Sequence, residues 1–422
     1  DGYLRAKASG SENVGLETGL GAGIGAGASV VAIGFEAFKG GGSTTTGANG
    51  SIFIGQEAGK AITTAASNIA IGYNSMLVHT TGARNIAIGH SAMDDTDAGS
   101  NSLNSSDNIF IGSHAGAGTW TDVLSQYNIG IGTNTLDGGL DGADYNVMIG
   151  YGAGSAITTG EKSIGIGGSA LLSATTSTLN TAVGFEAGVS LTTGAGQNTF
   201  LGYQAGRQAT TTTYSVFIGA YAGYNQSIGS NANVHIGWAA GQYASGSNNT
   251  FVGQEAGKGG TTSAPFSSGQ NNTAVGYQAF DGFTTGNNNT AVGRSAGDGI
   301  TTGSNNVLVG QDSDISAAAG TNQIVIGQGA TGHGNNIAVI GNGSATAIHP
   351  HDDNEVDLGS SSYEYKDLYI DGVAYLDAIN FNGTAITSTA AELNILDGVT
   401  STATELNIVD GNTSATSTTL AD

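Results

Sequence analysis

The sequence predicts an all-β repeat protein, a solenoid of about 18 stacked rungs. Three observations indicate this fold. A fragment of apolar residues followed by Gly recurs 18 times, at intervals of 14 to 23 residues that centre on 17. Apolar residues within the fragment occupy alternate positions, as they do on one face of a β-strand. Gly accounts for 72 of the 422 residues and Pro for only 2, which excludes a collagen-like chain.

The distribution of the repeats divides the chain into four segments. Residues 1–28 form a Gly-rich N-terminal segment, and residues 29–343 carry the repeats. Residues 344–387 form a short module of different composition, and residues 388–422 contain two tandem 13-residue copies. A solenoid grows in length without enlarging its core, so the repeat segment is expected to fold as one domain.

Each repeat is predicted to be a short strand that ends at its glycine. Counted from that glycine, positions −1 and −3 are aliphatic or Thr in nearly every copy, and we expect them to form the core of the roll. Position −2 is also mostly apolar, as at Phe110 and Met148, so we expect this second face to pack against other copies of the chain. The Thr-, Gly- and Asn-rich tracts between repeats predict turns, giving two short strands and two turns in each rung.

Two positions of the repeat have structural roles that their residue types indicate. The glycine is expected to permit a bulge or a positive φ at a corner of the coil. Position −4 is Asn in 12 copies, and identical amides on successive rungs can form a hydrogen-bonded ladder. The representative structural residues are Gly72, Gly89, Gly184, Gly202, Gly293, Asn68, Asn85, Asn180, Asn198 and Asn289.

Composition excludes several classes of function. Ten basic and 33 acidic residues give a net charge of −23, which repels nucleic acid and anionic membranes. No apolar stretch approaches the roughly 18 residues of a membrane span, so no membrane insertion is expected. The chain has no Cys, which excludes disulfides and thiolate metal sites. No Ser/His/Asp grouping or carboxylate pair stands out, so we expect no enzyme and no catalytic residue.

The pair His349 and His351 is the candidate metal site. Two His at i and i+2 on a strand share a face, and three chains around one axis would supply six imidazoles to a divalent transition metal. The alternative is an exposed polar connector that leads into the next module. No other cofactor is expected.

The repeat box, as in Ser163-Ile-Gly-Ile-Gly167, resembles the head of YadA-like trimeric adhesins over about residues 29–343. This resemblance implies a left-handed parallel β-roll that assembles as a homotrimer. The period here is longer and less even than in that family, so loops are expected to project from the roll. The candidate recognition loops are residues 35–51, 90–108, 113–128 and 254–272.

The C-terminal segments resemble parts of bacteriophage tail fibres. The stretch from Asp357-Leu-Gly to Lys366-Asp-Leu-Tyr369 resembles a module of such fibres, and the tandem copies at 389–398 and 402–411 are similar to segments in tail-fibre-like proteins of marine phages. Each copy begins with a Thr-x-x-Glu capping box and ends in Asp-Gly, which predicts one-turn helices in a trimeric stalk. Helices this short need neighbouring chains for stability.

These resemblances imply a structural trimeric fibre of a virion, located outside the cell, that presents a host-receptor-binding surface. The implied partners are other copies of the chain, a host surface glycan or protein receptor, and other virion tail proteins. A secreted or cell-surface adhesin or filament of a bacterium or archaeon is the first alternative. A polysaccharide-degrading tail spike is the second, and it would require clustered carboxylates in a groove.

Overall fold

The computed structural model describes residues 14–16, 29–40, 48–96, 104–194, 196–226, 229–349, 357–374, 376, 380–381 and 384–385. The chain divides into two units, Asp1–Thr346 and Ala347–Asp422, and each is described by itself. The one-turn helices expected within 389–411 lie outside the described residues, and the described part of the chain contains no helix.

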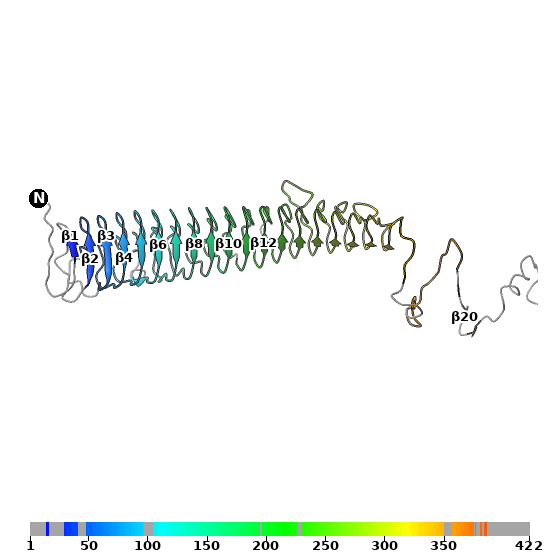
Figure 1. Cartoon of the computed structure of the whole chain (residues 1–422), viewed down its shortest axis with the longest axis horizontal. Helices are drawn as coiled ribbons and strands as arrows, with labels where there is room; N and C mark the ends of the chain where they lie inside the picture. Colours follow the sequence, from blue (N-terminus) through cyan, green and yellow to red (C-terminus); the bar gives the residue numbers. More distant parts are fainter. Residues whose placement is uncertain are drawn as a thin grey trace, which may run out of the picture. The chain divides into compact units, whose positions relative to one another are not determined.

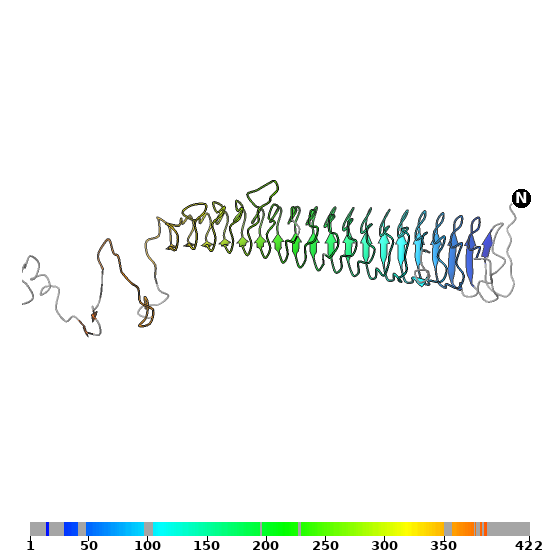
Figure 2. The same ribbon diagram turned by 180° about the vertical axis from the view of Figure 1, so that it is seen from behind.

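The first unit is a long row of short parallel strands, stacked side by side in chain order (Figures 1 and 2). Eighteen of its strands end directly before a repeat glycine, so each repeat supplies one rung and the prediction of an all-β solenoid is confirmed. The strands are β1 (Val14–Leu16), β2 (Val30–Ile33), β3 (Ser51–Ile54), β4 (Ile69–Ile71), β5 (Ile86–Ile88), β6 (Ile109–Ile111), β7 (Ile129–Ile131), β8 (Val147–Ile149), β9 (Ile164–Ile166), β10 (Thr181–Val183), β11 (Thr199–Leu201), β12 (Val216–Ile218), β13 (Val234–Ile236), β14 (Thr250–Val252), β15 (Thr273–Val275), β16 (Thr290–Val292), β17 (Val307–Val309), β18 (Ile324–Ile326) and β19 (Ala338–Ile340).

The additional strand, β1, lies in the segment that was expected only to be Gly-rich. It pairs with β2 in register, Val14 opposite Val31 and Leu16 opposite Ile33. The residue that follows β1 is Glu17 rather than Gly, so the glycine period does not reveal this strand.

The two faces of the strands are the reverse of the prediction. Position −2 points into the coil, and its side chains, among them Phe110 and Met148, are fully buried. Positions −3 and −1 lie on the outer surface, where Ile164 and Ile166 on either side of the buried Gly165 are exposed. The expectation that −1 and −3 form the core is therefore wrong, and the aliphatic residues are the ones that face outward.

A narrow coil explains why position −2 varies so much in size. Where −2 is a large ring, position +4 across the coil is usually Gly; a Cβ added to Gly59 would lie 2.3 Å from the Phe53 ring. In most rungs where −2 is small, +4 is large, as in the buried pair Ala70 and Met76. The exceptions are Ala182 and Ala291, where +4 is Gly. Because interiors are close-packed, the two positions must share one fixed volume. Where it holds, this coupling fills the core of the rung without changing the width of the coil.

The glycine that ends each strand is required by both its conformation and its surroundings. From Gly34 to Gly327 its φ lies between +129° and +145°, a region that side chains rarely adopt. A Cβ on Gly184 would lie 2.2 Å from the carbonyl oxygen of Gly202 on the next rung. The glycines therefore form a column in which successive rungs approach backbone to backbone.

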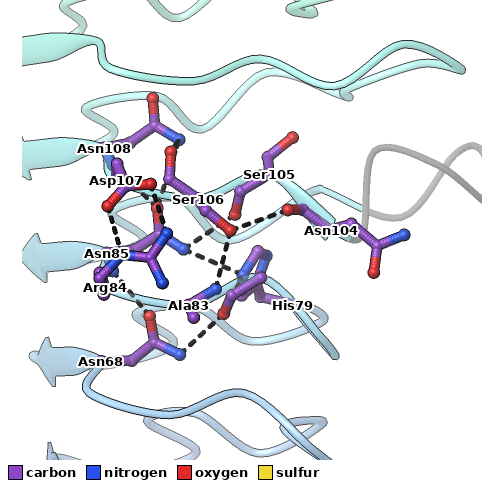
Figure 3. Close-up of polar contacts among 11 residues, drawn as sticks. Asn68, His79, Ala83, Arg84, Asn85, Asn104, Ser105, Ser106, Asp107 and Asn108 are labelled. Carbon is purple, nitrogen blue, oxygen red and sulfur yellow. Dashed lines mark hydrogen bonds and ion pairs between the residues drawn. The ribbon is translucent and has the colours of Figure 1, made fainter.

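Buried Asn side chains form a ladder beside this column, in which Ser163 and Ser215 replace Asn. The Oδ1 of Asn68 accepts a hydrogen bond from the backbone N–H of Asn85 at 2.7 Å, and the Oδ1 of Asn85 accepts one from Asn108 at 3.0 Å. The Nδ2 groups, with one exception, also donate to a carbonyl in the next turn, as from Asn68 to Gly82 at 2.9 Å. Figure 3 shows this part of the ladder. Eleven of the 12 Asn residues make the amide-to-turn bond, and Asn180 does not.

Among the described residues, each rung contains one strand rather than the expected two. The opposite side of the coil consists of turns, which are joined from rung to rung by backbone hydrogen bonds such as Thr284 N–H to Thr301 O at 2.8 Å. Only isolated bridges mark a second line of pairing there, for example between Thr178 and Gly196. In the second unit, β20 (Asn380–Phe381) and β21 (Thr384–Ala385) form an antiparallel pair.

Candidate interaction surfaces

The outer aliphatic face is an uncharged surface that runs the length of the described solenoid. We define it as positions −3 and −1 of β2 to β19, which contain only Ile, Val, Leu, Thr and Ala. The exposed fraction reaches 43% at Ile324 and 57% at Ile340. Eighteen strands at the sheet spacing of about 4.8 Å, each about 10 Å wide, give a face of roughly 800 Å². That area equals about one partner's share of a standard protein–protein interface.

One border of this face carries stacked and paired side chains at position −5. Arg84 makes a bidentate ion pair with Asp107, with Nε to Oδ1 at 2.5 Å and Nη2 to Oδ2 at 2.6 Å (Figure 3). On the next rungs the rings of Tyr127 and Tyr145 stack with centroids 4.8 Å apart. Charge is thus placed beside the outer aliphatic face and not within it.

The turn after the strand holds an aromatic cluster on three consecutive rungs, which we call the Tyr203 cluster. Its members are Phe185, Glu186, Tyr203, Gln204, Arg207, Tyr221 and Tyr224. The Tyr203 ring stacks on Phe185 at 5.8 Å and meets Tyr221 edge-on at 5.4 Å. Tyr221 in turn lies 5.8 Å from Tyr224.

Polar bonds fix the rest of the Tyr203 cluster. Arg207 donates from Nε to Glu186 at 2.6 Å and from Nη1 to the Tyr224 hydroxyl at 3.2 Å, and its guanidinium lies 5.7 Å from the Tyr224 ring centroid. Gln204 donates to the same carboxylate oxygen of Glu186 at 2.7 Å. The Arg207 hydrogen bond lowers the pKa of Glu186, so this carboxylate is held in its charged form.

The other tyrosines at position +1 behave differently from one another. The recurrence of Tyr at Tyr73, Tyr151, Tyr203 and Tyr277 predicts a repeated stacking ladder, with stacking on sugars as the alternative. Tyr73 stacks on His90 at 5.2 Å. Tyr151 and Tyr277 stack on no ring within the described ranges, and they are 65% and 43% exposed. The ladder is therefore local.

Two histidines are buried in the coil. His235 occupies position −2 and is sandwiched between Phe217 at 4.9 Å and Phe251 at 5.0 Å. Neither of its ring nitrogens has a hydrogen-bond partner among the described residues, and burial lowers its pKa to about 3. His79 is also fully buried, which lowers its pKa to about 4, although a hydrogen bond to the Gly82 carbonyl at 3.1 Å acts in the opposite direction.

Three carboxylates on consecutive rungs form a row that the sequence did not reveal. Burial raises the pKa of Asp281 and of Asp314, and the charge of Asp298 between them adds to the effect at both. Glu255 contributes further at Asp281. They follow the repeat glycine by four or five residues, a position whose residue type otherwise varies. The signal that would have found them is the offset of five residues that Asp281 and Asp298 share, with Asp314 one residue closer to its glycine.

The candidate metal ligands are not brought together. His349 is exposed and belongs to the second unit, at the end of the described range 229–349, and His351 lies outside the described residues. Within the part of the chain that is described, no three His, Cys, Asp or Glu side chains are grouped as metal ligands would be. The same part holds no helix with the length and apolar character needed to cross a bilayer.

Comparison with known proteins assigns no family. No protein-family model matches this chain, and a search of curated proteins finds no match.

Proposed function

We propose that the chain is a structural fibre protein whose copies associate through the outer aliphatic face, and that it serves as a bacteriophage tail or side fibre. In this proposal three chains form a left-handed roll around a common axis. The fibre extends from the virion and carries a host-receptor-binding surface on its turns. Its partners are further copies of itself, virion tail proteins and a host glycan or protein.

The observation that carries this proposal is the uninterrupted outer aliphatic face. An exposed apolar patch of several hundred Å² on a soluble protein marks an interaction site. Because the chain carries a net charge of −23, two copies repel each other over most surfaces, and the uncharged face is where they can approach. Every copy presents this face with the same rung spacing, so a second copy matches it along its whole length.

The mass of the protein in solution tests the assembly. We expect three times the chain mass of 41.7 kDa by light scattering or native mass spectrometry. The double variant Ile164→Glu/Ile166→Glu places two charges on the face at β9 and is expected to yield smaller species that keep the β-rich circular dichroism spectrum. Leu179→Glu is the matched control, because Leu179 is 47% exposed and lies outside the face. A folded monomer of the parent chain would refute the proposal.

A polysaccharide-degrading spike is a second candidate, favoured by the row of Asp281, Asp298 and Asp314. A carboxyl group with a raised pKa next to a charged carboxylate is the arrangement that glycosidic hydrolysis uses. This candidate predicts release of reducing sugar from host-type polysaccharides and its loss in Asp298→Asn. An assembled fibre that releases none would exclude it.

A further inference from the structure

We infer that the Tyr203 cluster is a binding site for a neutral, pyranose-containing glycan. The inference rests on the proposed attachment role, because it assigns the receptor-binding surface of the fibre to these seven residues. It also names the chemical class of the ligand.

The rings supply the apolar half of the recognition. Phe185 is 49% exposed and Tyr203 45% exposed, so about half of each side chain is open to solvent although the two stack on each other. A pyranose presents C–H groups on its faces and hydroxyls around its edge. Aromatic side chains that carry a polar group suit such a mixed surface, because they combine apolar area with a hydrogen-bonding tip.

The polar members supply the other half and are already held in place. Arg207, Glu186 and Gln204 are linked to one another through one carboxylate oxygen, and Arg207 is also bonded to Tyr224. Their remaining N–H groups and lone pairs are available to sugar hydroxyls. Because the bonds within the cluster fix these side chains before binding, little conformational entropy remains to be lost.

The charge balance selects a neutral ligand. The cluster contains one cation, Arg207, and one anion, Glu186, which form an ion pair at 2.6 Å. With a net charge of −23 on the whole chain, a strongly anionic glycan would be repelled. A neutral sugar meets no such penalty.

The position of the cluster leaves it accessible in an assembled fibre. Its members follow Gly184, Gly202 and Gly219, in the turn beyond the strands β10, β11 and β12. None of them belongs to positions −3 and −1, which form the outer aliphatic face. Association of chains through the outer aliphatic face therefore does not bury the Tyr203 cluster.

The test is a binding measurement with the assembled full chain and immobilised oligosaccharides. The probes are neutral hexose and N-acetylhexosamine oligomers, with uronic acid oligomers of the same length for comparison. We expect binding to the neutral set only, and a loss of at least tenfold in affinity in Tyr203→Ala and in Arg207→Ala.

The matched control is Tyr277→Ala, because Tyr277 occupies the same repeat position, is 43% exposed and lies outside the cluster. Its affinity is expected to equal that of the parent chain. Thermal unfolding of each variant checks that the fold is intact.

Three results would overturn the inference: no binding of any neutral oligosaccharide, binding that Tyr203→Ala leaves unchanged, or equal loss in Tyr277→Ala. Selective capture of a protein by the cluster, without sugar binding, would also overturn it. The oligomeric mass is measured on the same samples, so failure of sugar binding in an intact trimer is distinguished from failure of the fibre proposal.

Discussion

His235→Phe is expected to remove the acid sensitivity of the central rungs. The imidazole lies between Phe217 and Phe251 with no hydrogen-bond partner among the described residues, and burial lowers its pKa to about 3. When the rung opens, the ring regains its ordinary pKa of about 6.5. Above that pH the imidazole is neutral in both the closed and the open rung, so its titration does not change the stability of the rung. As the pH falls from about 6.5 toward 3, only the open state takes up the proton, so stability decreases.

The magnitude follows from the pH interval. A pH of about 5 lies about 1.5 units below the pKa of the imidazole in the open state. Protonation therefore stabilises the open state by about 2 kcal/mol relative to neutral pH, which increases the open population about 30-fold. A Phe at this position carries no proton, so its open population should be the same at both pH values. Phe also continues the stack of rings on either side, so we expect no loss of stability at neutral pH.

Hydrogen exchange measured by mass spectrometry is the appropriate assay, because it reports local opening in a long repeat array. Exchange of segment 233–252, corrected for the intrinsic rate, is compared at about pH 7.5 and about pH 5. Segment 69–88 serves as an internal control, since the buried His79 there keeps its own pH dependence in the variant. The reasoning is refuted if segment 233–252 loses protection at low pH equally in the parent chain and in His235→Phe.

Two further substitutions probe the columns of the solenoid. Gly184→Ala places a Cβ 2.2 Å from the Gly202 carbonyl oxygen, and we expect it to destabilise the fold by about 3 kcal/mol or to prevent folding. Gly343→Ala is the control, because the space around its Cβ is open, and it should leave the thermal unfolding temperature unchanged. Asn289→Ala leaves the buried backbone N–H of Asn306 without its acceptor at 3.1 Å and should cost about 2 to 3 kcal/mol, measured as local opening by hydrogen exchange. The nearby exposed Thr285→Ala should change opening by less than about 0.5 kcal/mol, and equal effects at the two positions would contradict the ladder argument.

The glycine period was sufficient to place 18 strands, because the backbone approach at each glycine excludes any side chain. The prediction of which strand face is buried was wrong, and the reason is physical. Uniform aliphatic residues at −3 and −1 look like a core, while the mixture of Phe, Ala, Gly and Met at −2 looks like a surface that tolerates change. In a coil this narrow, variation at −2 is compensated at +4 in most rungs, as in Phe53 with Gly59 and Ala70 with Met76.

The Tyr203 cluster could be predicted only in part from the sequence. The tyrosines at +1 were visible as a column, and Tyr203 belongs to it. Tyr221, Tyr224 and Arg207 lie at other offsets, and they join the cluster only because the chain turns sharply after each strand. The repeat period does not reveal which repeat positions become neighbours across a turn. The Tyr203 cluster could therefore be identified only from the folded structure.

The gap in the Asn ladder at Ser163 and Asn180 has a mechanical consequence. Tension along the roll passes through every junction between rungs in series, so the weakest junction sets the load that the rod can carry. Ser163 has no amide to reach the next turn, and the Nδ2 of Asn180 on the following rung is without a partner. Two successive junctions thus lack a bond that most others have, and a pulled fibre should yield first near β9 and β10, leaving the rungs on either side intact.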